Sequence, residues 1–284
     1  MKRYPALALL VCLSLTIPAL GQDKYVKDLG GTFFFNGDSV MEPADDLSSS
    51  RLEPAAFGIP PAKNQKAGSY SLLPGENFET KVYQVDSGLP GATVYIVAGT
   101  HGDERAGWYA GMMLASCGIN AGKLYVLPRA NLPGSLKAQR LLPSGGDLNR
   151  AYPGKAEGDQ AQRLAAAIFT DIKNAAPDLV LDLHEAADYA SDRDFMGNKL
   201  IFTDLEGMES LFFDLLSASE EGFLAQHPFG YVSPGTSGSL NRVVSIQLGI
   251  PVITIETFRG FPLSKRVQDQ VDIVLYCLRH EGML

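Results

Sequence analysis

The sequence predicts an α/β protein in which a mostly parallel mixed sheet is covered by helices on both faces, a three-layer sandwich. Segments of strand length alternate along the chain with amphipathic segments of helix length, which is the pattern of a mainly parallel sheet. Ala92–Ala98 is a nearly continuous apolar run, as in strands buried on both faces, and Leu179–His184 is a second buried strand. A chain of 284 residues, 45% hydrophobic and 20% charged, can bury a core without disulfide or metal staples.

Each element follows from its local pattern. Lys81–Val85 alternates polar and apolar side chains and is expected at the edge of the sheet. The strands predicted after it are Ala92–Ala98, Lys123–Leu127, Leu179–His184 and Val252–Glu256. The predicted helices are Arg105–Cys117, Asp159–Asn174, Met208–Leu224, Ser239–Leu248 and Leu263–Arg279, and a Gly/Ser-rich turn at Gly235–Gly238 precedes the fourth of them.

The N-terminus has the pattern of an export signal. Lys2 and Arg3 precede an apolar run that ends near a small-residue site at Ala19-Leu20-Gly21, and cleavage is expected after Gly21. A retained N-terminal anchor is the alternative. The predicted organisation is a signal peptide at 1–21, a mostly irregular Gly-, Pro- and Ser-rich extension at 22–77 and the main α/β domain at 78–284. A periplasmic or secreted location follows from this interpretation.

Charge and hydropathy exclude two classes of partner. The formal net charge is -8, from 32 acidic and 24 basic residues, and no Lys/Arg run occurs outside the extreme N-terminus, so a nucleic-acid partner is not expected. No later apolar run is long enough to span a membrane, so stable insertion is not expected after signal cleavage. Cys12 leaves with the signal. Cys117 and Cys277 lie among apolar neighbours in predicted helices; buried free thiols are favoured, with a disulfide as the alternative.

Histidine and glutamate follow three of the predicted strands. In sheets of this kind ligands bind where the loops leave the carboxyl ends of the strands. The first loop carries His101 and Glu104, three residues apart and able to aim at one point, and the other strands end at His184 and Glu256. Two histidines and one glutamate are a common ligand set for catalytic zinc, and they leave one position open for water. A core histidine is the alternative for His184 taken alone, and His227 and His280 are expected to be solvated.

A second group of polar residues surrounds a glycine-rich loop. Arg140, Asn149 and Arg150 lie within the stretch Arg140-Leu141-Leu142-Pro143-Ser144-Gly145-Gly146-Asp147-Leu148-Asn149-Arg150. Because the planar guanidinium group suits bidentate recognition of a carboxylate, this loop is a candidate substrate-binding segment. An ordinary charged surface loop is the alternative.

These motifs together resemble the zinc carboxypeptidase superfamily. The forms Gly-Thr-His-Gly-Asp-Glu, ending at Glu104, and Asp-Leu-Asn-Arg-x-Tyr-Pro-Gly, beginning at Asp147, are most similar to its succinylglutamate desuccinylase/aspartoacylase branch. Asp182-Leu183-His184 and Ile255-Glu256-Thr257-Phe258-Arg259 follow in the order of that branch, and the resemblance covers about residues 92–259. It implies a zinc carboxypeptidase-like fold and one bound zinc ion.

The resemblance also implies a role for each matching residue. His101, Glu104 and His184 would bind the zinc, Glu256 would be the general base, and Arg140 would polarise the scissile carbonyl. Asn149 and Arg150 would bind the substrate carboxylate, and Asp147 would contact a ligand histidine. Tyr231 matches a mobile tyrosine, although its spacing differs, and Leu240 at the specificity position would make the side-chain pocket apolar.

One departure from the branch affects the expected substrate. The branch carries a sizeable β domain after its catalytic glutamate, whereas a single predicted helix follows Glu256. We therefore expect an exported zinc hydrolase that cleaves an amide bond next to a free carboxylate, with a peptide or cell-wall peptide as substrate. An N-acyl amino acid deacylase is the first alternative and a non-catalytic zinc-dependent binding protein is the second. The presence of Glu256 favours an enzyme, because a binding protein needs no extra carboxylate beside the metal.

Overall fold

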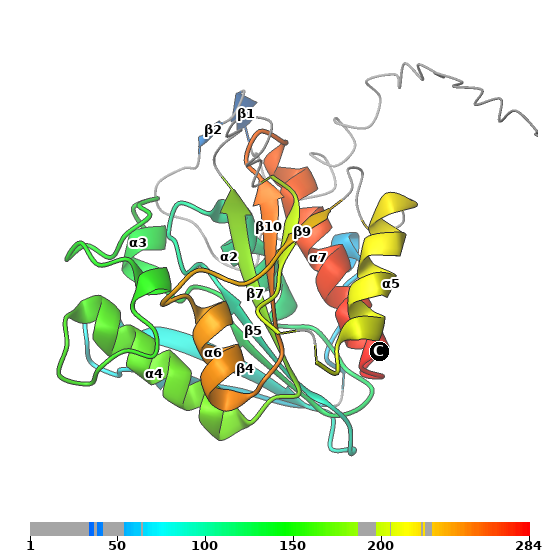
Figure 1. Cartoon of the computed structure of the whole chain (residues 1–284), viewed down its shortest axis with the longest axis horizontal. Coiled ribbons are helices and arrows are strands. Elements are labelled where there is room, and N and C mark those ends of the chain that lie inside the picture. The colour runs from blue at the N-terminus through cyan, green and yellow to red at the C-terminus, as the bar shows by residue number, and fades with distance from the viewer. Residues whose placement is uncertain are drawn as a thin grey trace, which may run out of the picture.

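A single large sheet forms the centre of the molecule (Figure 1). The computed structural model describes residues 54–63, 65–186, 197–204, 206–222, 224 and 229–284, together with the backbone of 34–36 and 39–41. Those two short segments form an antiparallel pair, β1 (Phe34–Asn36) and β2 (Ser39–Met41). The expected signal peptide at 1–21 lies outside the described residues, as does His227.

The main sheet has eight strands in the order β3-β4-β6-β5-β7-β10-β8-β9. Its four central strands, from β6 to β10, are mutually parallel. The pairs β3–β4, β4–β6 and β8–β10 are antiparallel, and β9 runs parallel to β8. The strands are β3 (Lys66–Leu72), β4 (Thr80–Asp86), β5 (Thr93–Ala98), β6 (Lys123–Leu127), β7 (Leu179–Ala186), β8 (Lys199–Ile201), β9 (Gly230–Val232) and β10 (Val252–Phe258). The predicted mostly parallel mixed sheet is confirmed.

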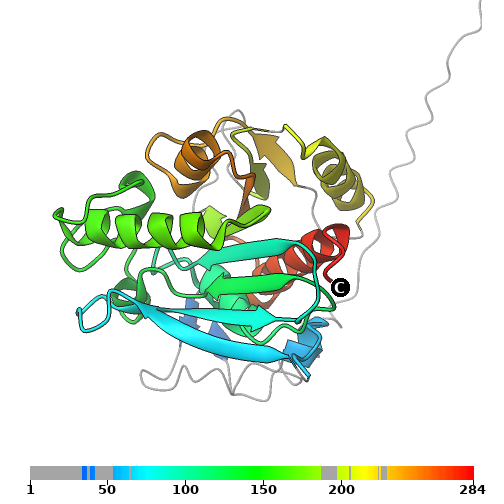
Figure 2. The same ribbon diagram turned by 90° about the horizontal axis from the view of Figure 1, so that it is seen from below.

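Helices cover both faces of this sheet. They are α2 (Arg105–Leu114), α3 (Leu132–Ser135), α4 (Gln160–Ala175), α5 (Glu209–Glu220), α6 (Leu240–Leu248) and α7 (Leu263–His280). One apolar core joins the sheet to α2, α5 and α7, and a second joins it to α4 and α6. Figure 2 shows α4 running along one face of the twisted sheet. The three-layer sandwich predicted from the sequence is therefore correct.

Side-chain caps begin three of the α-helices, α3, α4 and α6. The Asp159 carboxylate accepts a hydrogen bond from the Gln162 N–H at 2.9 Å, and the Ser239 hydroxyl accepts one from the Arg242 N–H at 3.2 Å. These bonds satisfy amide groups that have no partner inside the helix. All five predicted helices form, and their observed bounds differ from the expected ones mainly in the last turn.

Three strands of the main sheet were not expected. β3 lies inside the segment 22–77, which was predicted to be mostly irregular, and it takes the outer edge of the sheet, so β4 is the second strand rather than the edge. The residues of β3 are mostly exposed and include glycine and serine, so its sequence lacks the apolar alternation of a half-buried strand. β8 and β9 are three residues long, too short to show a period.

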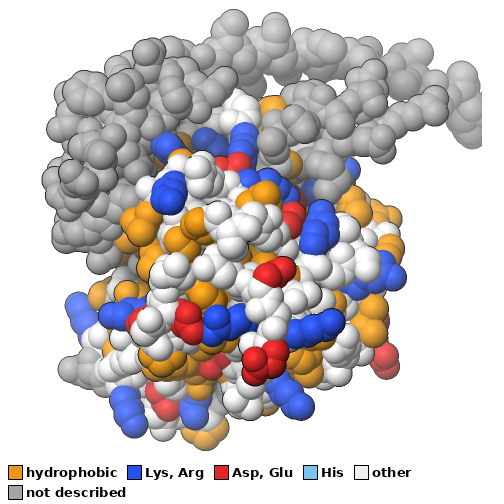
Figure 3. Space-filling view, turned by 90° about the vertical axis from the view of Figure 1, so that its left-hand side faces the viewer, with side chains coloured by type: hydrophobic (Ala, Val, Ile, Leu, Met, Phe, Trp, Pro, Cys, Tyr) orange, Lys and Arg blue, Asp and Glu red, His pale blue; other side chains and the backbone are white. Residues whose placement is uncertain are grey.

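The surface carries charges of both signs (Figure 3), and the two described cysteines are buried. Basic and acidic side chains are interspersed on the face shown in Figure 3. Cys117 and Cys277 are both buried free thiols, as the sequence favoured. Within the described part of the chain, none of the helices combines the length and apolar character needed to cross a bilayer.

Candidate metal centre and active site

The parallel strands β5, β7 and β10 bring the candidate ligands to one edge of the sheet. His101 follows the end of β5, and His184 lies near the end of β7. Glu256 on β10 is the register partner of His184. The strand-end argument made from the sequence thus correctly places these residues at the carboxyl ends of neighbouring strands.

His101, Glu104 and His184 form a buried cluster that could hold a metal ion. One ligand atom from each residue lies within 4.8 Å of the other two. Nδ1 of His101 is 2.6 Å from Oε1 of Glu104, and Nδ1 of His184 is 2.7 Å from Oε2 of the same carboxylate. Two imidazole nitrogens and a carboxylate oxygen are a donor set that suits zinc, so the chemistry of the site fits the ion implied by the resemblance.

Each imidazole is contacted by a carboxylate on its other side. Nε2 of His101 lies 3.2 Å from Oδ1 of Asp147, as the resemblance implied, and Nε2 of His184 lies 3.1 Å from Oδ1 of Asp182. Carboxylates in this position fix the orientation of ligand histidines and raise their basicity. Asp182 was not among the predicted site residues, although its place two residues before His184 on a strand puts both side chains on one face.

The charges in this cluster stabilise one another. Although burial alone would raise it, the pKa of Glu104 is held well below its ordinary value by His184 and His101. Burial would lower the pKa of His184, but the Asp182 and Glu104 carboxylates raise it well above the usual range. The hydrogen bond with His101 is the main reason that the pKa of Asp147 falls to about 2. These shifts mark a concentrated set of opposite charges, as at functional sites.

The local fold leaves the Glu104 carboxylate available for this cluster. Glu104 is the N-cap residue of α2, but its side chain makes no cap hydrogen bond. Glu185 replaces it, because its Oε2 accepts a hydrogen bond from the Ala106 N–H at 2.9 Å. Arg266 of α7 pairs with the buried Glu185 carboxylate and offsets its charge. Glu185 and Arg266 were both missed by the sequence analysis.

Glu256 lies beside the cluster without being one of its three members. Burial is the first cause of a pKa of about 7, with Glu104 and Asp182 raising it further and the histidines opposing them. A carboxylate with this pKa can both accept and return a proton near neutral pH.

Arg140 reaches the cluster from the glycine-rich loop. Its Nη1 donates to Oε1 of Glu104 at 3.1 Å, and its Nη2 lies 3.9 Å from Oδ2 of Asp147. The side chain is 45% exposed, so it stands between the buried ligands and the solvent. This is a suitable place for a group that contacts a substrate carbonyl.

Asn149 and Arg150 lie on the same loop as Arg140. Oδ1 of Asn149 accepts a hydrogen bond from the Leu240 N–H at 3.1 Å, and this bond does not use the two N–H donors of the Asn149 side chain. Arg150 is exposed, and its Nη1 donates to the Asn149 carbonyl at 2.7 Å. Leu240 itself is completely buried in the core beneath α6, so in this structure its side chain is a core residue.

The Gly/Ser-rich turn packs against this loop. Gly238 has a φ of +76°, and a Cβ there would come within 2.5 Å of the Arg150 carbonyl oxygen, so only glycine fits.

Tyr231 lies on β9, and its side chain is 59% exposed. Its ring packs edge-on against the ring of Phe212, with 5.3 Å between the ring centroids. The structure thus places Tyr231 against α5, and its role in substrate binding stays a prediction.

A further contact crosses the site. Nη1 of Arg259, just after β10, donates to Oδ2 of Asp103 at 3.0 Å, and its Nη2 lies 3.9 Å from Oε1 of Glu104. The sequence analysis used Arg259 only as part of a motif and gave no role to Asp103. No sequence signal joins residues that are 156 positions apart.

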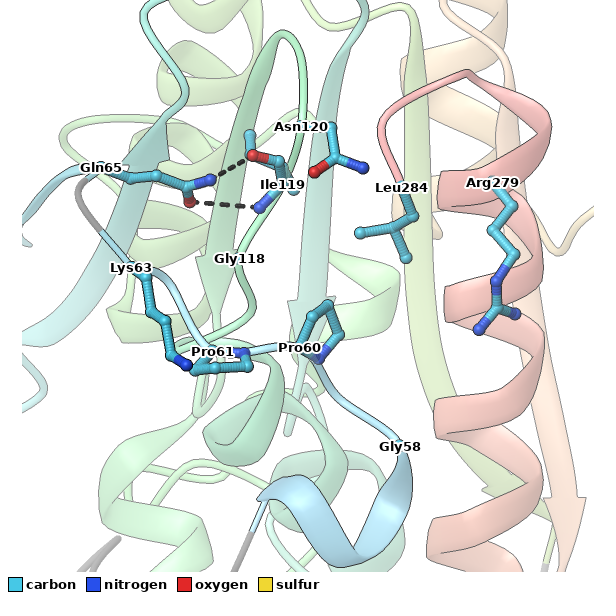
Figure 4. Close-up of a pocket in the computed structure, with 10 residues that line it drawn as sticks. All are labelled: Gly58, Pro60, Pro61, Lys63, Gln65, Gly118, Ile119, Asn120, Arg279 and Leu284. Atoms are coloured by element: carbon cyan, nitrogen blue, oxygen red, sulfur yellow. Dashed lines mark hydrogen bonds between the residues drawn. The ribbon is translucent and has the colours of Figure 1, made fainter.

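Two cavities lie away from this centre. One, of about 400 Å³, is lined by Lys63, Gln65, Asn120 and Arg279 among others (Figure 4). Asn120 precedes β6 and Arg279 lies in the last turn of α7, so this cavity is at the amino ends of the parallel strands, opposite the cluster. The other, of about 850 Å³, is bordered by residues of β4 and α2. Neither is lined by a predicted site residue.

Comparison with known proteins agrees with this geometry. The family model of the succinylglutamate desuccinylase/aspartoacylase catalytic domain matches residues 90–265, more than half of the chain. The N-alpha-acetyl-L-2,4-diaminobutyric acid deacetylase of Halomonas elongata is 35% identical over 99 residues, which make up 33% of this chain and 28% of that protein. The alignment thus spans less than a third of this curated relative.

Solved structures show the same fold. A succinylglutamate desuccinylase from Silicibacter sp. TM1040 has a TM-score of 0.59 at 20% identity, over 80% of this chain and 70% of that one. A metallo-carboxypeptidase from Burkholderia cenocepacia has a TM-score of 0.57 at 16% identity, over 80% and 67%. His101, Glu104, His184 and Glu256 all lie inside the range matched by the family model, and the chain belongs to the succinylglutamate desuccinylase/aspartoacylase catalytic-domain family.

Proposed function

We propose that the protein is a zinc-dependent hydrolase that cleaves the amide bond of an N-acyl amino acid, next to a free carboxylate. The family match and the deacetylase relative support this substrate class over the peptide or cell-wall peptide that the sequence analysis placed first. Hydrolysis of a peptide at its carboxyl end remains an outcome that the experiment below separates.

One observation carries the proposal. Two buried imidazoles turn their Nδ1 atoms toward one glutamate, each has an aspartate beside its Nε2, and a fourth carboxylate, Glu256, lies outside the set. Three protein ligands with an additional acid–base group are what hydrolysis requires, whereas a structural zinc site uses four protein ligands.

The side chains divide the reaction between them. When bound, zinc would supply an activated water and polarise the scissile carbonyl. Glu256 would take a proton from the attacking water and give it to the leaving amine. Arg140 stands where it can stabilise negative charge on the carbonyl oxygen, and Asn149 and Arg150 bind the carboxylate of the substrate.

The test measures metal and turnover separately. Zinc content is determined for the wild type and for Glu256→Gln, and both are assayed with N-acetyl and N-succinyl amino acids and with dipeptides that end in the same residues. The proposal expects stoichiometric zinc in both proteins, turnover of acyl amino acids by the wild type, and none by the variant. Turnover of dipeptides alone would replace the deacylase with a carboxypeptidase, and zinc loss in Glu256→Gln would show that Glu256 is a ligand.

We also propose that the protein is exported and acts in the periplasm or outside the cell. The basic and apolar pattern of the first 21 residues supports this. Expression of the full chain in a bacterial host, followed by fractionation and N-terminal sequencing, should give a periplasmic or secreted product that begins at Gln22. An uncleaved cytosolic product would contradict the proposal.

A further inference from the structure

Two of the three candidate ligands lie on one short loop. Residues 99–104 connect β5 to α2, and the last four of them, 101–104, are called the claw loop here because they carry His101 and Glu104. These four residues belong to no strand or helix. Contacts with neighbouring segments therefore determine the shape of the loop. Small shifts of it would separate the two ligand atoms.

Two hydrogen bonds join the claw loop to neighbouring segments. The Gly102 N–H donates to the Arg140 carbonyl at 3.3 Å, and a Cβ on Gly102 would come within 2.1 Å of the Gly134 backbone. The Glu185 N–H donates to Oε2 of Glu104 at 3.1 Å. These bonds join the loop to the glycine-rich segment and to β7.

Arg259 connects the claw loop to the strand that carries Glu256. Its guanidinium donates to Asp103, which lies on the loop directly before the ligand Glu104, and both side chains are about three-quarters buried. Its own N–H donates to the Ala186 carbonyl at 2.9 Å, which holds it beside the end of β7. Charge-assisted hydrogen bonds that are partly shielded from water are among the stronger polar contacts in proteins.

We propose that Arg259 is a positioning residue for the metal centre, acting through Asp103. The pair holds the claw loop at a fixed place relative to β10, and thereby sets the position of the metal ligands relative to Glu256. The inference rests on the proposed zinc site, but it does not depend on the substrate.

The sign of the effect separates positioning from simple electrostatics. Arg259 brings a positive charge to within 3.9 Å of a candidate ligand, so charge alone predicts that its removal strengthens the binding of a cation. On charge alone, removal of the Asp103 carboxylate would weaken the binding of a cation. If the pair works by positioning, both changes weaken zinc binding, and making the second change after the first adds little.

The experiment measures zinc affinity by competition with a chelator, with no substrate present. Arg259→Gln, Asp103→Asn and the double variant should each raise the zinc Kd by about tenfold or more, the range for residues that support a ligand. Arg259→Lys keeps the positive charge but lacks the planar guanidinium group, so its zinc affinity should lie between those of Arg259→Gln and the wild type. At saturating zinc, Arg259→Gln should lower kcat while KM stays within about twofold, because the substrate carboxylate is bound elsewhere.

A matched control removes another arginine ion pair. Arg163 pairs with Glu76 away from the claw loop, and Arg163→Gln should change the melting temperature without changing the zinc Kd. Unchanged or tighter zinc binding in both Arg259→Gln and Arg259→Lys would overturn the positioning role. A wild-type protein that binds no zinc would contradict the proposed function instead, so the two failures are distinguishable.

Discussion

Nε2 of His184 lies 3.1 Å from Oδ1 of Asp182, and both side chains are almost completely buried on the same face of β7. The second oxygen of Asp182 accepts a hydrogen bond from the Thr254 hydroxyl on β10 at 3.2 Å. A charged carboxylate is costly to bury without partners, so its place behind a candidate ligand is a specific feature of the site. Because Nε2 of His184 faces Asp182, Nδ1 is the nitrogen that faces Glu104.

Asp182→Asn should therefore weaken zinc binding. The change keeps the size of the side chain but removes the negative charge that orients His184 and raises its basicity, so we expect the zinc Kd to rise about ten- to a hundredfold. Chelator competition measures it. Thr254→Val is the control, because it removes only the hydroxyl that supports Asp182 and should have a smaller effect. An unchanged Kd in Asp182→Asn would show that the contact is structural only.

The fold could be predicted where burial leaves a continuous apolar run or a regular apolar period in the sequence. β5, β7 and β10 are strongly apolar and were predicted, and each predicted helix has an apolar face on one of the two cores. β3 could not be recognised, because an exposed edge strand needs no alternating apolar side chains and is held by its pairing with β4.

The candidate site was predictable for a different reason. Parallel strands deliver their following loops to one edge, so His101 and His184 could be brought together without knowledge of any side-chain contact. The groups that hold these ligands could not be found in this way, because Arg259 and Arg266 meet Asp103 and Glu185 through the packing of separate elements. Among the supporting residues that the sequence analysis missed, Asp182 alone could have been recognised from local sequence, because it lies two residues before His184 and on the same face of β7.

Glu256 should destabilise the metal-free protein at neutral pH. Its pKa rises from an ordinary 4.5 to about 7 in the folded state, mainly through burial, so folding favours its protonated form. Stability is therefore unaffected below pH 4.5, falls as pH rises to about 7, and is lowest above that.

The comparison with Glu256→Gln isolates this effect, because glutamine does not titrate. In the presence of a chelator, the variant should match the wild type at pH 4.5 and exceed its free energy of unfolding at pH 8 by an amount on the order of 3 kcal/mol. Denaturant unfolding at several pH values measures the difference. Added zinc should reduce it, since a nearby cation stabilises the carboxylate. A difference that does not change with pH would contradict the raised pKa.

Cys117 and Cys277 should be unreactive in the folded protein. Burial raises the pKa of the Cys117 thiol to about 12 and that of Cys277 also upward, so neither forms the nucleophilic thiolate at neutral pH. In protein that begins at Gln22, an aromatic disulfide reagent should label neither thiol under native conditions and both after unfolding without reductant. Cys117→Ala should then lose one of the two. Absence of labelling after unfolding would indicate a disulfide.

Arg150 should determine which substrates are accepted. Its guanidinium is exposed on the loop that also carries Arg140, and its contact with the Asn149 carbonyl uses only Nη1, which leaves the other donors for a planar carboxylate. Hydrogen bonds to charged groups contribute about 1.5–3 kcal/mol, so Arg150→Ala should lower kcat/KM by roughly ten- to a hundredfold or more for substrates with a free carboxylate.

Amidated substrates provide the control for this change. They should already be poor substrates of the wild type, and Arg150→Ala should alter their kcat/KM little, because the contact that it removes is one they do not make. Arg242→Ala is a matched variant, since that guanidinium donates to the Gly235 carbonyl and has no predicted role in substrate binding. If the wild type cuts amidated and free substrates equally well, recognition of a carboxylate is wrong, and an amidase that acts within a chain replaces the deacylase.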